Sequence, residues 1–427
     1  MNKTKPARHI AMDLLIRLER DESYSNILLD HAIKDIQDGK EKAFTAALFY
    51  GVLERKLSLD HIIASLSSIP LAKLSPQVHQ ILRIAIYQLM YMDYVPESAA
   101  VNEAVNLTEK ANVKSAKGFV NAVLRNFIRS GKKLDLSGMD RLQALSIEYS
   151  CPLWLVQKLH KEYGHIEEIL STTMERPPLA IRVNTVKTTA DELVKKLAPQ
   201  GIMVEKSKEL ADCLIIDKAG DIERLSEYMD GLFHVQDISS QLCCTMLAPQ
   251  PGETILDLCS APGGKTFTLA QLMDNKGEII ACDLHRKRVD LVSSGAKRLG
   301  LDIIKTMVSN AKEHNPEMPM ADKILCDVPC SGLGIIRRKP EIKYKPQAMH
   351  DALPEIQLTI LKNSANYLKA GGTLIYSTCT LSRAENDDVV DKFLKDSPHF
   401  SEIERQTFLP ERASGDGFFA AKLQKVN

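Results

Sequence analysis

The sequence predicts a Rossmann-like α/β domain with a doubly wound, mainly parallel sheet, preceded by an all-helical domain and a small α+β segment. Apolar residues recur at helical spacing almost without a break from Lys5 to about Ser130. From Ile255 onward, strand patterns alternate with helix patterns, which is typical of a parallel sheet covered by helices. A compact stretch of mixed strands and helices lies between these parts. We expect three domains, at 1–135, 136–237 and 238–427.

The N-terminal part is predicted to be a bundle of helices. Its apolar side chains form stripes with a period of about 3.6 residues that begin at Ala11, Val78 and Phe119. Prolines and a glycine between the stripes mark the ends of further helical segments. The last helix of this part, 115–130, has several cations, which suit either RNA phosphates or a solvated helix face.

The middle segment has the order β-α-β-β-α-β. The predicted elements are 179–186, 189–197, 202–206, 213–217, 222–229 and 232–237. This order is typical of a ferredoxin-like or RNA-recognition-like unit. The aromatic platform of a true RNA-recognition motif is missing.

The C-terminal part alternates strands and helices at the spacing of a doubly wound sheet. The predicted strands are Ile255–Leu258, Glu278–Cys282, Ile303–Val308, Lys323–Asp327, Gly372–Ser377 and Gly417–Leu423. The predicted helices are Thr266–Leu272, Lys287–Leu299, Leu353–Leu368 and Ala384–Leu394. We expect the last strand to pair at an end of the sheet.

Composition limits the classes of protein that the chain can belong to. Its 427 residues include 55 basic and 55 acidic side chains, so a nucleic acid would have to bind at local patches rather than in a global positive field. No window of about twenty consecutive apolar residues occurs, which predicts no membrane span and a cytoplasmic protein. The nine cysteines form no zinc-ligand pattern and no disulfide framework, so reduced thiols and no metal are expected.

The stretch 254–266, TILDLCSAPGGKT, predicts a strand, a glycine turn and a helix N-terminus that together cradle a ligand. It is not a P-loop, because Cys259 stands where that motif has its first glycine, and the dinucleotide fingerprint GxGxxG is absent. Asp283 closes the next strand, where a carboxylate accepts both hydroxyls of a ribose. A nucleoside without phosphates, such as S-adenosyl-L-methionine, fits this set.

Two cysteines follow two different strands of the predicted sheet. Cys330 lies three residues after Asp327, and Cys379 follows a later strand, so both thiols are expected at the carboxyl edge beside the glycine turn. Methylation of a pyrimidine at C5 requires such a set, because a thiolate must add to C6 before C5 becomes nucleophilic. A carboxylic acid near N3, expected at Asp327, would stabilise charge on the ring. A second cysteine or a water could remove the C5 proton.

The motifs CSAPGGKT, DVPCSG and STCT, in this order, resemble those of the NOL/NOP/Sun family of RNA 5-methylcytosine methyltransferases. The segments AAVNEAVNLTEK and KGFVNAVLRNFIR resemble the helical domain of NusB, which implies RNA contact. The resemblance covers nearly the whole chain. It implies a class I methyltransferase domain that uses S-adenosyl-L-methionine to methylate a cytidine of 16S ribosomal RNA through a covalent cysteine–C6 adduct.

In this family Cys379 corresponds to the nucleophile and Cys330 to the thiol that assists product release. The resemblance implies cofactor contacts at Cys259, Ser260, Ala261, Pro262, Gly263, Gly264, Lys265, Asp283, Asn310 and Asp327. The family usually has Asp at Asn310, so the contact there loses a charge but keeps an acceptor. Ser260 for the more usual Ala is a small change.

Several alternatives remain open from the sequence. The chain could be a non-catalytic RNA-binding or assembly factor, or a methyltransferase for protein or small molecules, although the latter would not need two thiols. The loop with Arg337, Arg338, Lys339, Lys343 and Lys345 suits either an RNA phosphate track or a solvated loop. Helix capping is the expected role of Glu385 and Asn386, and Lys265 either anchors its loop or polarises the site. We expect a monomer.

Overall fold

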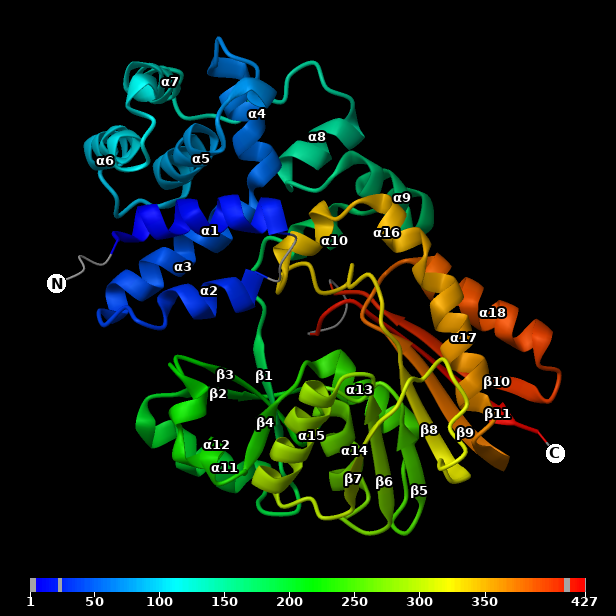
Figure 1. Cartoon of the computed structure of the whole chain (residues 1–427). Coiled ribbons are helices and arrows are strands. Elements are labelled where there is room, and N and C mark those ends of the chain that lie inside the picture. Colours follow the sequence, from blue (N-terminus) through cyan, green and yellow to red (C-terminus); the bar gives the residue numbers. More distant parts are fainter. Residues whose placement is uncertain (1–4, 22–24, 411–414, 427) are drawn as a thin grey trace. The chain divides into compact units, whose positions relative to one another are not determined.

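The computed structural model describes residues 5–21, 25–410 and 415–426 (Figure 1). Contacts divide the chain into two compact units. Unit 1 comprises Met1–Glu175 and Ile336–Lys345, and unit 2 comprises Arg176–Ile335 and Pro346–Asn427. The expected division into three domains stays a prediction. The two units are described separately.

All regular elements of unit 1 among its described residues are helices. Its α-helices are α1 (Ala7–Asp21), α2 (Ser25–Ile33), α3 (Gly39–Glu54), α4 (Lys56–Leu66), α5 (Pro76–Tyr91), α6 (Glu97–Lys110), α7 (Lys117–Arg129), α8 (Arg141–Glu148), α9 (Leu153–Tyr163) and α10 (Glu167–Thr172). Short 3-10 turns are η1 (Leu71–Lys73), η2 (Lys114–Ala116) and η5 (Pro340–Tyr344).

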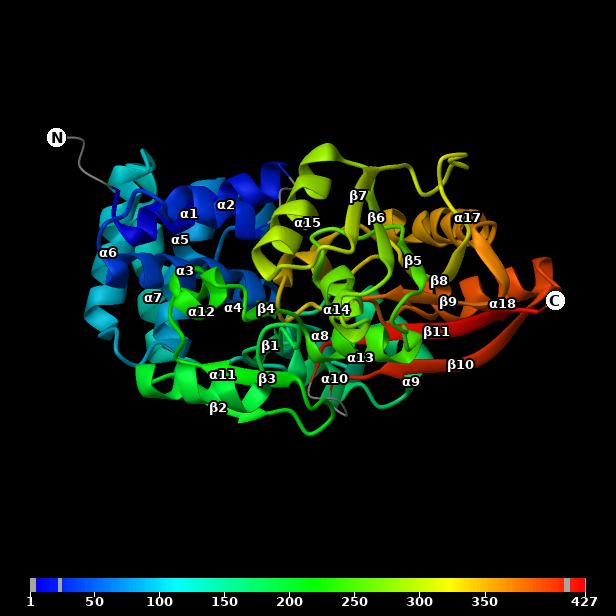
Figure 2. The same ribbon diagram turned by 90° about the horizontal axis from the view of Figure 1, so that it is seen from below.

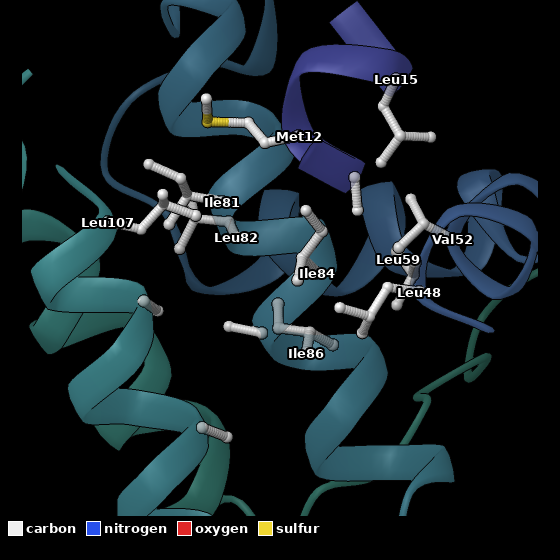
Figure 3. Packing of buried hydrophobic residues seen from close by; sticks show 14 of the residues in the cluster. Met12, Leu15, Leu48, Val52, Leu59, Ile81, Leu82, Ile84, Ile86 and Leu107 are labelled. Carbon is white, nitrogen blue, oxygen red and sulfur yellow. The ribbon is translucent and has the colours of Figure 1, made fainter. Parts of the chain in front are cut away.

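Helix α5 lies at the centre of this bundle, where it packs against α1, α3, α4, α6 and α7. Ser75 caps it by accepting a hydrogen bond from the Val78 amide, and Pro76 occupies its first turn, where no amide hydrogen is needed. Its apolar stripe forms the core with helices α1, α3, α4 and α6 (Figure 3). The apolar residues that recur at helical spacing in the sequence therefore form the buried faces of these helices.

Arg83 brings a charge into this core, with only 3% of the residue exposed. Its guanidinium pairs with Asp60 at 2.6 Å and with Glu19 at 2.8 Å. Burial alone would raise the pKa of Asp60, but hydrogen bonds from His79 and Arg83 outweigh it and lower that pKa to about 2. The core of unit 1 thus contains a fixed ion pair.

The segment 336–345 belongs to unit 1, although it follows the Cys330 turn in the sequence. Lys343 is buried, and its ammonium donates to the carbonyls of Glu54 at 2.8 Å and Tyr149 at 3.4 Å. The Tyr344 hydroxyl donates to the Leu53 carbonyl at 2.9 Å. Burial lowers the pKa of Lys343 to about 8.

These contacts correct the expected phosphate track. Lys343 faces backbone carbonyls inside the helical unit and is not available to RNA, because only 1% of it is exposed. The other four cations of the loop are half-buried. The sequence pattern was ambiguous because a lysine's long stem suits a solvated loop and a buried ion site equally.

Unit 2 begins with a four-stranded antiparallel sheet in the order β2-β3-β1-β4, the strand order of a ferredoxin-like unit. Its elements are β1 (Leu179–Val183), α11 (Ala190–Leu197), η3 (Ala198–Gln200), β2 (Met203–Lys206), β3 (Cys213–Asp217), η4 (Ile222–Arg224), α12 (Ser226–Met229) and β4 (Phe233–Val235). The predicted helix 222–229 is split into η4 and α12.

The rest of unit 2 is a seven-stranded sheet in the order β10-β11-β9-β8-β5-β6-β7. The strands are β5 (Thr254–Asp257), β6 (Glu278–Asp283), β7 (Ile304–Val308), β8 (Ala321–Asp327), β9 (Leu368–Thr378), β10 (Phe400–Phe408) and β11 (Phe418–Lys425). The helices are α13 (Ile238–Leu247), α14 (Gly264–Leu272), α15 (Arg286–Leu299), α16 (Gln347–Asp351), α17 (Leu353–Ala365) and α18 (Asp387–Asp396), with the turn η6 (Arg383–Glu385).

The five strands β5 to β9 are parallel, which confirms the predicted doubly wound sheet. Both faces are covered. Ile255 packs in a core with α13, α14 and α15, whereas the next residue, Leu256, packs in a core with α17 and α18. The chain runs outward from β5 through β6 to β7 and then returns to β8 on the other side, so β5 and β8 form the topological switch point.

The prediction that the last strand pairs at an end of the sheet is wrong. Strand β11 lies between β9 and β10 and pairs antiparallel with both (Figure 2). Strand β10 was not predicted because its residues, FSEIERQTF, are mostly polar and most of them are exposed. An edge strand keeps one side in water and therefore tolerates such a composition.

Among the described residues, the structure contains no helix of the length and apolar character needed to cross a bilayer. In the same part of the chain, no three His, Cys, Asp or Glu side chains gather in a way that could bind a metal ion.

Candidate active site

The glycine turn joins β5 to α14 and owes its shape to two glycines. Gly263 has φ +111°, and a Cβ there would lie 2.4 Å from the Phe267 ring, so both backbone and packing require glycine. At Gly264 a Cβ would make only ordinary contacts, the nearest at 3.7 Å from the Gln236 side chain. The protein itself therefore does not demand glycine at 264, and its missing side chain leaves room beside the helix N-terminus.

A cavity of about 210 Å³ opens at this turn. Its lining comprises Val235, Gln236, Asp237, Ser240, Asp257, Cys259, Ser260, Ala261, Pro262, Gly264, Lys265 and Asp327. Most of the cofactor contacts expected from the sequence line it. Gly263, Asp283 and Asn310 do not.

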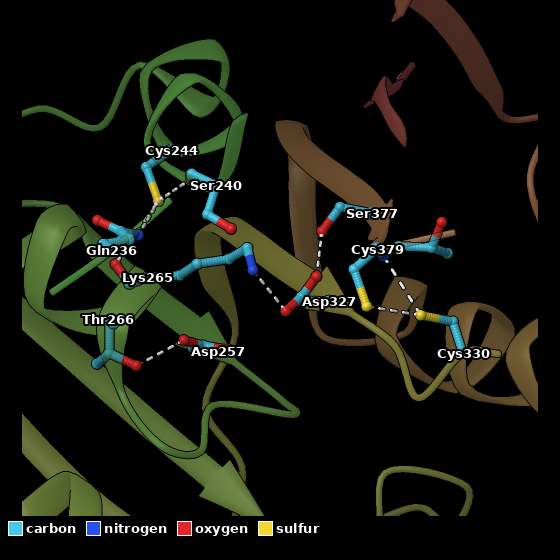
Figure 4. Close-up of polar contacts among 12 residues, drawn as sticks. Gln236, Ser240, Cys244, Asp257, Lys265, Thr266, Asp327, Cys330, Ser377 and Cys379 are labelled. Carbon is cyan, nitrogen blue, oxygen red and sulfur yellow. Dashed lines mark hydrogen bonds and ion pairs between the residues drawn. The ribbon is translucent and has the colours of Figure 1, made fainter. Parts of the chain in front are cut away.

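Asp257 ends β5 at the base of the cavity and is fully buried. Its Oδ2 accepts a hydrogen bond of 2.6 Å from the Thr266 hydroxyl (Figure 4). Burial raises the pKa of Asp257 to about 7, and the nearby carboxylate of Asp327 adds to this rise. The site therefore has one carboxyl group that titrates near neutral pH.

Asp283 closes β6 as predicted and lies against the glycine turn, with Oδ2 3.4 Å from the Ala261 amide. Arg288, which sequence reasoning missed, lies 3.5 Å from Asp283 Oδ2 and donates to the Ala261 carbonyl at 2.9 Å. Asn310 follows β7, where its side chain is engaged within its own turn by Glu313 and the Lys312 amide. Its carbonyl oxygen already accepts one hydrogen bond.

Lys265, Asp327 and Ser377 connect the glycine turn with the end of β9 (Figure 4). Lys265 Nζ lies 2.7 Å from Asp327 Oδ2, and the Ser377 hydroxyl donates to Oδ1 at 2.8 Å. Burial would lower the pKa of Lys265, but the Asp327 carboxylate outweighs it, and the net effect raises that pKa. Both contacts hold the Asp327 side chain in place, with Lys265 at Oδ2 and Ser377 at Oδ1. The acid role expected for Asp327 from the sequence stays a prediction.

The two thiols meet at the carboxyl edge of the sheet. Cys330 Sγ lies 3.1 Å from Cys379 Sγ, and the Cys379 amide donates to Cys330 Sγ at 3.3 Å (Figure 4). Both are free cysteines. The hydrogen bond with Cys379 and burial raise the pKa of Cys330 well above its ordinary value, and the charges of Glu385 and Asp327 add to the rise.

The expected capping role of Glu385 and Asn386 is wrong. Asn386 precedes α18, but its side chain makes no capping hydrogen bond to that helix. Both side chains are buried and point instead to the two cysteine turns. The sequence suggested a cap because Asn before an acidic first turn is a common helix start.

Gln236, Asp237 and Ser240 also line the cavity, and sequence reasoning did not single them out. Gln236 and Asp237 lie between β4 and α13, and Ser240 lies in the first turn of α13. No motif marks these residues, since an isolated polar side chain after a strand has no specific signature.

Comparisons with known proteins give three family matches along the chain. Residues 244–424 match the family described as "16S rRNA methyltransferase RsmB/F". Residues 5–129 match the NusB family, and residues 151–223 match the ferredoxin-like domain of RsmF/B-like methyltransferases.

Full-length relatives are similar as well. The chain is 37% identical to the probable ribosomal RNA small subunit methyltransferase B of Bacillus subtilis, with 100% of both chains covered. It is 33% identical to ribosomal RNA small subunit methyltransferase B of Escherichia coli, again over 100% of both. Among solved structures, that of PH0851 has a TM-score of 0.83 at 27% identity and covers 99% of each chain.

Proposed function

The chain belongs to the RsmB/F family of 16S rRNA methyltransferases, and we propose that it methylates C5 of a cytidine in 16S ribosomal RNA. The observation that supports this reaction is the pair of thiols 3.1 Å apart at the end of the sheet. Methyl transfer to a nucleophilic nitrogen or oxygen needs no thiol, whereas transfer to C5 needs one that adds to C6. The resemblance of the sequence motifs to the family implies cytosine 967 as the target position.

The proposed methyl donor is S-adenosyl-L-methionine, which supplies a methyl group on a positively charged sulfonium. The cavity at the glycine turn suits such a ligand. The protein has room for a side chain at residue 264, and the glycine there leaves that room free for a ligand. Residues Cys259 to Lys265 would surround it, and Asp283 would accept the ribose hydroxyls. Asn310 retains an acceptor lone pair for an adenine amino group.

Cys379 is the proposed nucleophile, in agreement with the family's motif. Cys330 stays protonated because its pKa is raised, so its S–H is available to donate to the Cys379 sulfur and to stabilise the thiolate there. The Cys379 thiolate then adds to C6 of the cytosine, and the electron pair of the C5–C6 bond becomes available at C5 for the methyl group.

Cys330 is the proposed release group. The hydrogen bond with Cys379 contributes most to the raised pKa of Cys330, and it weakens once the Cys379 sulfur is bonded to carbon, because a thioether is a poorer acceptor than a thiolate. The pKa of Cys330 therefore falls, its S–H proton passes to solvent, and the resulting thiolate takes the C5 proton. The C–H electrons re-form the C5–C6 double bond, and the C6–S bond breaks with its electron pair returning to Cys379.

Asp327 is proposed to recognise the base. Lys265 and Ser377 hold its side chain, and we expect its oxygens to accept hydrogen bonds from the amino group of cytosine. Uracil presents a carbonyl oxygen at the same position, so that two hydrogen-bond acceptors, this oxygen and Asp327, would face each other. Asp327 thereby favours cytosine over uracil.

The proposed partner is 16S ribosomal RNA, naked or in an early small-subunit particle, bound by a cytoplasmic monomer. The domain limits at 135 and 237 are part of this proposal, with the NusB-like region 5–129 as an RNA-binding domain. The target cytidine must be unstacked or single-stranded, because Cys379 has to approach C6 from one face of the ring.

Incubation of the protein with unmethylated small-subunit RNA and radiolabelled S-adenosyl-L-methionine tests the proposal, followed by bisulfite mapping of the product. Label in RNA as 5-methylcytidine at one position supports it. RNA binding without label would instead indicate an assembly factor, and label in protein would indicate a protein methyltransferase. Either result overturns the proposed reaction.

A further inference from the structure

Glu385 makes contacts that a helix cap does not need. Only 1% of the residue is exposed, and its carboxylate accepts hydrogen bonds from the Ser331 amide at 2.8 Å and the Ser331 hydroxyl at 2.5 Å. The Gln357 amide adds a third hydrogen bond at 3.0 Å. Ser331 directly follows Cys330, so the carboxylate holds the turn on which that thiol lies.

Asn386, the next residue, binds the other thiol turn. Its Oδ1 accepts a hydrogen bond of 2.6 Å from the Thr378 hydroxyl, and its Nδ2 donates to the Thr380 carbonyl at 2.9 Å. These two threonines flank Cys379 on both sides. Ser331 Oγ lies 2.7 Å from Thr380 Oγ1 and joins the two turns directly.

The backbone at this pair is itself anchored, because the buried Tyr376 hydroxyl donates to the Glu385 carbonyl at 2.6 Å. Two adjacent residues on one rigid turn thus each hold one cysteine. Hydrogen bonds between buried polar groups favour a single arrangement, since a displacement that breaks one leaves a buried group without its partner.

We propose that Glu385 and Asn386 are positioning residues that set the separation of Cys330 and Cys379, and that the Glu385 charge opposes a thiolate at Cys330. The roles of the thiols in this inference rest on the proposed function. The separation of the two thiols does not rest on the proposed function, because it follows from the hydrogen bonds of Glu385 and Asn386 alone. Asn386 acts by geometry, whereas Glu385 acts by geometry and charge.

The groups that face Cys330 come from three elements. They are Cys379 after β9, Glu385 in η6 and Asp327 at the end of β8, whose charge is balanced by Lys265. The hydrogen bond with Cys379, burial and the charges of both carboxylates raise the pKa of Cys330. Removal of the Glu385 charge should therefore lower the pH at which Cys330 becomes a thiolate.

The geometric role is tested without RNA. Diamide, which takes up the two thiol hydrogens, oxidises neighbouring cysteines to a disulfide, and peptide mapping measures the Cys330–Cys379 cross-link. Asn386→Ala should slow its formation about tenfold, as expected for loss of a buried hydrogen-bond partner. Thr378→Val removes the same contact from the other side and should act in the same direction. Asp388→Asn, an exposed change in α18, is the matched control and should react at the wild-type rate.

The charge role is tested by the pH profile of Cys330 alkylation with iodoacetamide, resolved by peptide mapping. Glu385→Gln should move the midpoint to lower pH, while Ser331→Ala, which keeps the charge, should leave the midpoint close to that of wild type. With RNA, Asn386→Ala should reduce kcat with little change in KM.

Each outcome decides one part of the inference. Unchanged cross-linking in both Asn386→Ala and Thr378→Val overturns the geometric role, and an unchanged alkylation midpoint in Glu385→Gln overturns the charge role. A wild-type protein that makes no 5-methylcytidine contradicts the proposed function, yet both thiol measurements remain interpretable.

Discussion

Cys330 Sγ and Cys379 Sγ lie 3.1 Å apart, although 49 residues separate them in the sequence. Their proximity follows from the sheet, because β8 and β9 are parallel neighbours and each cysteine lies just beyond the carboxyl end of its strand.

Replacement of the proposed nucleophile should abolish turnover. Cys379→Ala removes the sulfur that adds to C6, so we expect neither methyl transfer nor any covalent RNA adduct, measured by tritium incorporation and denaturing gels. Cys282→Ala, a buried cysteine change in β6, controls for loss of a thiol. An adduct that persists in Cys379→Ala contradicts the assignment.

Replacement of the proposed release thiol should trap the intermediate. In Cys330→Ala no thiol remains near C5, so elimination slows and a covalent protein–RNA species should accumulate as a shifted band on a denaturing gel. The band should be absent from the double variant with Cys379→Ala. If wild type and Cys330→Ala give identical gels, the release role is wrong.

Loss of the fixed carboxylate should reduce the rate of the chemical step. Asp327→Asn keeps the shape but places an amide beside Lys265, so we expect a loss in kcat on the order of 100-fold, as for removal of one preorganised polar group. Single-turnover kinetics measure it. Ser377→Ala removes only one of the two contacts and should cost less; equal losses would argue against a direct role of Asp327.

The buried ion pair of unit 1 should produce an acid-sensitive stability. Because Asp60 has a folded-state pKa of about 2, below its unfolded value, its contribution is complete above about pH 4 and is lost as pH falls towards 2. Asp60→Asn should therefore destabilise unit 1 at pH 7 by on the order of 2 kcal/mol or more in urea unfolding. The difference from wild type should shrink below pH 4. Asp93→Asn, an exposed change, should show no such trend.

Lys343 should make the protein less stable around neutral pH than at alkaline pH, whereas Asp60 makes it less stable in acid. Its folded-state pKa of about 8 lies below the ordinary lysine value, so the unfolded chain binds more protons between about pH 8 and 10 and stability rises with pH there. Lys343→Met should remove this rise, measured as the shift of the urea midpoint between pH 8 and 10. Lys73→Met at an exposed site is the control, and a rise that survives in Lys343→Met would contradict the buried position.

Much of the architecture was predictable because periodicity reports burial. Ile255 and Leu256 point to opposite faces of one strand, and both being apolar indicates a sheet covered on two sides. Strand β10 was not predicted for the same reason. Most of its residues are polar and exposed, as suits an edge strand, so no apolar pattern marks it as a strand.

The candidate site was predictable where function depends on a motif. The glycine turn, Asp327 and both cysteines stand in short segments whose strand context could be recognised, and the sheet topology then implied one common edge. Glu385 and Asn386 could not be assigned in this way. Their partners are Ser331 after β8, Thr378 at the end of β9 and Thr380 just beyond it, and an exposed fraction of 1% or less is a property of the folded chain.

By itself, the sequence determined the fold class, the strand that begins the site and the choice of the proposed reactive side chains, because these depend on local pattern and residue chemistry. Only the tertiary structure decided that Lys265 pairs with Asp327, that Lys343 faces backbone carbonyls, and that two adjacent residues hold both thiol turns. The physical reason is that charge and hydrogen-bond partners depend on distances between segments far apart along the chain, which residue order alone does not specify.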